Sequence, residues 1–232
     1  MRGCLFVLVL GLAVLGGVAW FGGPPIAGAL VTTTLTASGL TADELDVRVE
    51  TDPPIAIAVG RVDRLTIIGS DVTWNDLIAS SMDLVLTDVD LVGRSAGEAD
   101  GRFVDVVIEA PDDEPVLVDV TFAGPADAAA TTIAIDRAST ERLAVGALEA
   151  ELGITPESVE LVAPDRVRFT AAGQEVDARL AIATSGGIEA TSLLGTFEVI
   201  DVGGLPLELT DLSIGQAGLE LTGLLDLSTL LD

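Results

Sequence analysis

Several residue types that carry most enzyme chemistry are absent or rare in this chain. Its 232 residues include no histidine, no lysine and no tyrosine, and cysteine occurs once, as Cys4. Without histidine there is no usual general base, no Ser-His-Asp triad and no imidazole ligand for a metal. A single cysteine excludes a disulfide framework within the chain and a cysteine-based metal cluster. We therefore expect no enzymatic activity, no catalytic residues, no metal and no cofactor.

Aromatic residues and positive charges are also scarce. Aromatics make up 3% of the chain and hydrophobic residues 49%, so any core or cavity is lined by aliphatic side chains rather than rings. Eleven arginines against 37 acidic residues give a formal net charge of −26. Such a surface repels phosphate backbones and anionic bilayers, so we expect no nucleic-acid partner. A solvated acidic face is the simplest interpretation, and a specific cationic partner is the alternative.

An uncharged apolar run opens the chain. Arg2 is followed by 18 residues, 4 to 21, that carry no charge. This run can span a bilayer as a slightly short helix, although Ala27-Gly28-Ala29 resembles a cleavage site, and a buried core helix is the remaining alternative. With Arg2 in the cytoplasm, anchoring and cleavage both place the rest of the chain outside it. We expect residues 1–29 to be a membrane anchor or signal segment and residues 30–232 an extracytoplasmic domain of the cell envelope, anchored or secreted.

One amphipathic helix is predicted beyond this run, over residues 139–152. Ser139 or Thr140 can cap its first turn, and Gly153 can end it in a left-handed conformation. The chain on both sides has the pattern of short strands, so an antiparallel sheet is the simplest cover for the apolar face of the helix. The fold class is therefore α+β: a mostly antiparallel β-sheet curved around or packed on one main helix, after an N-terminal apolar anchor helix.

The predicted strands alternate with turn residues. They precede the helix at 45–50, 55–59, 62–68, 72–74, 82–92, 103–110, 116–122 and 132–135, and follow it at 158–162, 167–171, 176–183, 188–190, 194–200, 207–214 and 219–221. Residues 75–80 are predicted to form a short helical turn or loop, and 224–231 a last helical turn. Both faces of 55–59 and 82–92 are apolar, which fits a sheet whose second face meets a helix, another sheet or a ligand.

Two acidic clusters and one pair of arginines are charged groups that could bind a ligand. Asp88 with Asp90, and residues 112–114, could bind a hard cation, but a solvated strand face or a turn explains them more simply. Arg61 and Arg64 form a local basic exception in an acidic chain. They could contact a phosphate headgroup or pair with neighbouring acids such as Asp63.

Two segments resemble the LmeA-like phospholipid-binding family of bacterial cell-envelope proteins. The first is Val47-Arg48-Val49 followed by residues 53–63, PPIAIAVGRVD, which resemble the family's strand, Pro-hydrophobic turn and Gly-Arg step. The second is LPLEL at 205–209 with Leu212 and then GLELTG at 218–223, which resemble its closing hairpin. The resemblance covers roughly residues 40–226. It implies a fold similar to the tubular lipid-binding folds, in which a curved sheet and a helix enclose an apolar groove for acyl chains, with no catalytic residues.

The resulting hypothesis is a noncatalytic, extracytoplasmic phospholipid-binding or lipid-handling protein, with a phospholipid or another two-chain amphiphile as ligand and the membrane as partner of the N-terminal segment. The alternative is a membrane-tethered structural or protein-interaction domain with a filled core. An apolar groove would favour the first and close packing the second. The predicted lipid-binding residues are apolar positions, with Arg61 as a headgroup contact: Ile55, Ile57, Val59, Arg61, Leu65, Ile67, Leu84, Leu86, Leu143, Leu148 and Leu180.

Overall fold

A computed structural model describes residues 39–74, 77–93, 95–108, 115–200 and 206–228, together with residues 32, 35 and 36. The predicted anchor or signal segment, residues 1–29, lies outside this part of the chain. No helix within the described ranges is long and apolar enough to cross a membrane.

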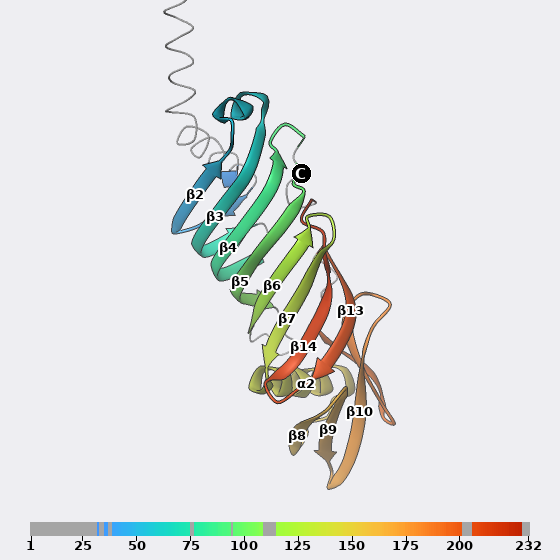
Figure 1. Cartoon of the computed structure of the whole chain (residues 1–232). Coiled ribbons are helices and arrows are strands. Elements are labelled where there is room, and N and C mark those ends of the chain that lie inside the picture. Colours follow the sequence, from blue (N-terminus) through green and yellow to red (C-terminus); the bar gives the residue numbers. More distant parts are fainter. Residues whose placement is uncertain are drawn as a thin grey trace, which may run out of the picture.

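The larger of two antiparallel sheets contains nine strands. Its order is β1-β3-β4-β5-β6-β7-β14-β13, with β2 also paired with β3. The strands are β1 (Leu40–Thr41), β2 (Glu44–Glu50), β3 (Arg61–Trp74), β4 (Leu77–Asp90), β5 (Glu98–Ile108), β6 (Val116–Pro125), β7 (Ala129–Asp136), β13 (Leu207–Ile214) and β14 (Gly218–Leu225). Consecutive strands from β3 to β7 are sheet neighbours, which is the topology that short turns between strand patterns favour. Figure 1 shows them as a twisted ladder.

The smaller sheet has five strands in the order β12-β11-β10-β9-β8. Its strands are β8 (Ser158–Val162), β9 (Arg166–Ala171), β10 (Gln174–Ile182), β11 (Ile188–Ser192) and β12 (Gly195–Ile200). The helix α2 (Arg137–Leu152) contacts β8 and β12 of this sheet and β7 and β14 of the larger one. Thus α2 and the smaller sheet lie at the β7–β14 end of the ladder (Figure 1). The expected β-rich fold with one main helix is confirmed for the described residues.

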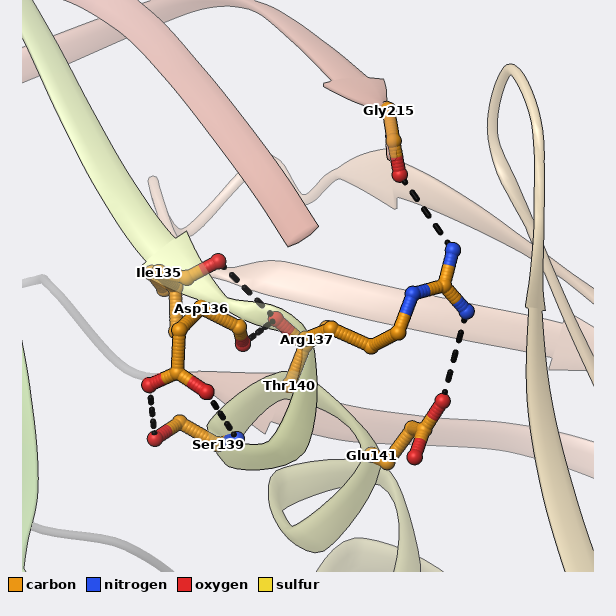
Figure 2. Close-up of polar contacts among 7 residues, drawn as sticks. All are labelled: Ile135, Asp136, Arg137, Ser139, Thr140, Glu141 and Gly215. Carbon is orange, nitrogen blue, oxygen red and sulfur yellow. Dashed lines mark hydrogen bonds and ion pairs between the residues drawn. The ribbon is translucent and has the colours of Figure 1, made fainter. Parts of the chain in front are cut away.

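The first turn of α2 is capped by Asp136, the last residue of β7, and not by Ser139 or Thr140. The Asp136 carboxylate accepts a 3.0 Å hydrogen bond from the Ser139 backbone N–H and a 2.6 Å bond from its hydroxyl (Figure 2). The Thr140 hydroxyl donates instead to the Asp136 carbonyl oxygen at 2.8 Å. A carboxylate three residues before Ser139 therefore takes the capping position. Gly153 ends the helix with φ 64°, as predicted.

The predicted strand over 55–59 is wrong, because this segment is the 3-10 helix η1 (Pro54–Val59). Its apolar residues alternate like those of a strand, yet Pro53 and Pro54 have no N–H groups to donate to a ladder, and proline suits the first helical turn. Gly60, with φ 80°, ends η1. The prediction for 75–80 is wrong from Leu77 onward, where β4 begins, and the predicted helical turn over 224–231 is wrong at its start, because Leu224 and Leu225 belong to β14.

The turn expected between the predicted strands 62–68 and 72–74 is also absent, because β3 runs through residues 69–71. Asp71 adopts φ 47°, and the buried positions step from Gly69 to Val72 instead of alternating. A Cβ on Gly69 would lie 2.8 Å from Val72 Cγ2, which places both residues on one face. The left-handed residue therefore shifts the alternation by one position without ending the strand, and Trp74 stays on the same face as Ile67.

Candidate functional site

Four of the predicted lipid-binding residues form one aliphatic block on the larger sheet. In the antiparallel register of β3 and β4, Leu65 is opposite Leu86 and Ile67 is opposite Leu84. Cross-strand partners have neighbouring side chains, so the four side chains make a continuous surface. Their exposed fractions are 3% for Leu65 and 1% for Ile67, Leu84 and Leu86. The block therefore belongs to the core.

The same buried face continues along and across the strands. Met82 is paired with Gly69 on one side and with Phe103 of β5 on the other. The Phe103 and Phe122 rings lie 5.5 Å apart between centroids, and the Phe122 ring covers Gly101, where a Cβ would come within 2.6 Å of it. We call the buried side of β3, β4 and β5 the apolar face. It is mainly aliphatic, as the low aromatic content predicts.

The η1 residues do not extend the apolar face in a regular way. Ile57 is half-buried and packs against the core, whereas the Val59 side chain is 68% exposed. The backbone of Ile55 lies in η1, and its side chain is outside the described part of the structure. Because η1 is helical, residues two apart no longer share a face, and Ile57 and Val59 differ in exposure.

The remaining apolar candidates lie at the other end of the ladder. Leu143 and Leu148 of α2 and Leu180 of β10 are buried, with exposed fractions of 2%, 0% and 2%. The helix packs between β7 and β14 on one side and β8 and β12 on the other. In the sheet order β7 lies four strands from β3, about 19 Å at the usual strand spacing. The predicted residues thus form two groups, one on the apolar face and one around α2.

Arg61 is exposed at the start of β3 and lies opposite Asp90 of β4. The Asp90 carboxylate accepts hydrogen bonds from the backbone N–H groups of Gly93 and Val92, at 2.9 and 3.0 Å. These bonds, with a smaller contribution from the charge of Arg61, hold the pKa of Asp90 below its usual value. Asp90 therefore shapes the turn after β4, and Arg61 lies opposite it in the register of β3 and β4.

The opposite, solvent-facing side of the sheet has two grooves that were not among the predictions from the sequence. Their volumes are about 530 and 460 Å³, and both include Val85, Asp100 and Ala123 in their lining. Arg102 in the larger groove forms an ion pair with Asp119. Alternating small and charged residues on β4 to β7 are the sequence signal for this surface, which a twisted sheet makes concave.

The described residues contain no group of three or more His, Cys, Asp or Glu side chains arranged to hold a metal ion. Asp88 is exposed and adopts φ 52°, and the Asp90 carboxylate accepts its hydrogen bonds from the turn after β4. The acidic residues 112–114 lie outside the described part of the chain.

Comparisons with models of known protein families, with curated proteins and with solved structures found no match. The two segments on which the expected resemblance to the LmeA-like family rests fall on distinct parts of the larger sheet. The first spans β2, η1 and the start of β3, and the second lies mainly on the antiparallel pair β13 and β14.

Proposed function

We propose that this chain is a noncatalytic phospholipid-binding or lipid-handling protein of the cell envelope, held outside the cytoplasm by its N-terminal segment. The apolar face is the observation that carries the proposal. It continues over β3, β4 and β5, whereas α2 packs at β7 and β14, strands away from it. An aliphatic surface of this kind can accommodate acyl chains by burial alone, in line with the tubular lipid-binding folds that the sequence resembles.

The energetics favour acyl recognition over headgroup recognition. Each buried methylene contributes about 0.8 kcal/mol, so a single acyl chain can outweigh the repulsion between an anionic headgroup and a chain of net charge −26. No cluster of cations accompanies the apolar face among the described residues, and Arg61 lies beside Asp90. We therefore expect acyl length to matter more than headgroup charge.

One observation favours a second candidate, a membrane-tethered interaction domain with a filled core. The side chains of Leu65, Ile67, Leu84 and Leu86 are only 1–3% exposed. In a filled core these residues serve stability alone. In the lipid-binding account the acyl chains enter among them, and the apolar face opens to receive the ligand.

Two adjacent residues of β3 separate these candidates. Ile67 is 1% exposed on the apolar face, whereas Ile68 is 40% exposed on the opposite face. Threonine retains the β-branched shape that suits a strand but adds a hydroxyl. We expect Ile67→Thr to lower retained lipid several-fold and Ile68→Thr to leave it unchanged, measured by mass spectrometry of lipid extracted from the full chain.

Thermal melts of both variants identify any loss of lipid that comes from unfolding, so occupancy is compared only between folded proteins. Equal lipid content in folded Ile67→Thr and Ile68→Thr would contradict the lipid-binding account. Wild-type protein that carries no lipid would support the filled-core domain instead.

A further inference from the structure

Trp74, the last residue of β3, has a buried polar atom that the fold does not satisfy. Its side chain is 3% exposed, and its indole nitrogen Nε1 has no hydrogen-bond partner among the described residues. A buried tryptophan N–H usually finds an acceptor, because leaving it unpaired costs the free energy of its lost hydration. The Trp74 N–H is therefore a donor available to a molecule that enters the core.

The position of Trp74 ties this donor to the apolar face. The left-handed Asp71 keeps Trp74 on the same face of β3 as Ile67. The two residues are about 23 Å apart at the rise of an extended strand. That span exceeds the ~15 Å taken by one leaflet of a bilayer's hydrocarbon core, so this length of β3 matches that of an acyl chain.

The surroundings of Trp74 determine what kind of acceptor it can meet. Its neighbours in register are Leu40 of β1 and Leu77 of β4, and Leu40 is fully buried. Burying an anionic phosphate among such residues would cost far more than burying a neutral carbonyl. A phosphate is therefore disfavoured here, and an ester carbonyl, which links an acyl chain to the glycerol of a diacyl lipid, fits the site.

We propose that the Trp74 indole N–H donates a hydrogen bond to an ester carbonyl of a bound diacyl lipid, with the acyl chain running along β3 toward Ile67. This inference rests on the proposed lipid-binding function. It assigns Trp74 as the residue that fixes the depth of the lipid, with the headgroup at the Leu40 end of the apolar face.

The test compares dioleoyl phosphatidylcholine with its dialkyl ether analogue, which lacks the ester carbonyls. The chain has two tryptophans, so a full-length Trp20→Phe protein leaves Trp74 as the only indole. We expect this protein to bind the ester lipid roughly three- to tenfold more tightly than the ether lipid, which is the worth of one net hydrogen bond. Adding Trp74→Phe should remove that preference. The indole N–H band in the Raman spectrum should shift with the ester lipid only.

Leu40→Ala is the matched control, because it removes apolar volume beside Trp74 and keeps the N–H. It should weaken binding of both lipids by the same factor and preserve the ester preference. Equal affinity of the Trp20→Phe protein for ester and ether lipids would overturn the role of Trp74 while leaving lipid binding intact. Failure of the unaltered chain to bind either lipid would overturn both proposals.

Discussion

Three aspartates with positive φ keep the buried residues of the long strands β3, β4 and β5 on one face. Asp71, Asp88 and Asp105 adopt φ values of 47°, 52° and 52°, one each in β3, β4 and β5. Asp105 coincides with a register shift between β5 and β6. Aspartate tolerates this left-handed region better than most residues because its short polar side chain can bond locally. In each case the buried residues on either side of the aspartate are three positions apart instead of two. The apolar side chains therefore stay on one face, although strict alternation would move them to the other face beyond the aspartate.

Asp88 can be tested against Asp83, another exposed aspartate on β4 that has no left-handed φ. A β-branched side chain is strained at positive φ, so Asp88→Val should lower the free energy of unfolding by about 1–3 kcal/mol. Asp83→Val should change it by less than ~0.5 kcal/mol or raise it, because valine favours extended backbone. Urea unfolding curves measure both. Equal destabilisation by the two substitutions would show that the left-handed conformation at Asp88 carries no strain.

At the scale of elements, α2 is held at its first turn by several independent contacts. Arg137 donates a 3.4 Å bond to the Gly215 carbonyl oxygen and pairs with Glu141 at the same distance (Figure 2). Gly218 of β14 lies so close to β7 that a Cβ there would be 2.0 Å from the Ile135 carbonyl oxygen. The start of α2 is thereby joined to the β7–β14 pair.

The Asp136 cap should make the stability of this junction pH-dependent. The Ser139 hydroxyl, followed by the Ser139 backbone N–H, lowers the pKa of Asp136 in the folded protein. A lowered folded pKa contributes stability above the unfolded value of about 4, and that stability is lost as the pH falls through the folded pKa. Asp136→Asn keeps an acceptor but cannot ionise. The difference in unfolding free energy between wild type and Asp136→Asn should therefore shrink as the pH falls from about 5 to 2.

Urea unfolding at a series of pH values measures this difference. Ser139→Ala, which removes the strongest cause of the pKa shift, should reduce the same pH dependence without altering the charge of residue 136. A difference between wild type and Asp136→Asn that stayed constant over this pH range would exclude a role for the Asp136 charge.

The local sequence pattern predicted many strands correctly, but it did not predict features that depend on residues far apart in the chain. The predicted strands at 158–162 and 207–214 coincide with β8 and β13, because period-two apolar residues are bounded there by turn residues. Residues 55–59 have the same alternation, but the two preceding prolines make them helical. The placement of α2 between two sheets depends on which strands pair across the chain, and periodicity does not contain that information.

At the scale of the whole molecule, the candidate site was predicted in part. Ile67 and Leu84 meet because consecutive strands pair as a hairpin, which the sequence favours. Leu143 lies elsewhere because α2 packs on β7 and β14, and β4, β5 and β6 separate β7 from β3 in the sheet. Trp74, which we propose as a ligand contact, was not among the predicted site residues. Its signal was present, since it is the only tryptophan after the apolar N-terminal run and ends a strand of aliphatic residues.

The apolar face, the two grooves and the helix α2 lie on different sides or ends of the larger sheet. The apolar face of β3 to β5 holds the aliphatic block and Trp74, and the reverse face carries the two grooves. The helix α2 and the smaller sheet lie at the β7–β14 end of the larger sheet (Figure 1). Burial of acyl chains is insensitive to salt, whereas attraction between exposed charges is screened within a few Å at high ionic strength. The salt dependence of lipid binding therefore distinguishes apolar from electrostatic binding.

The most direct measurement is the lipid content of the purified full-length chain, quantified by extraction and mass spectrometry after washing at low salt and at ~0.5 M salt. The account predicts a fixed molar amount of a two-chain amphiphile that survives the high-salt wash and is selected by acyl length rather than by headgroup charge. Protein free of lipid, or lipid that is lost in the high-salt wash, would contradict it.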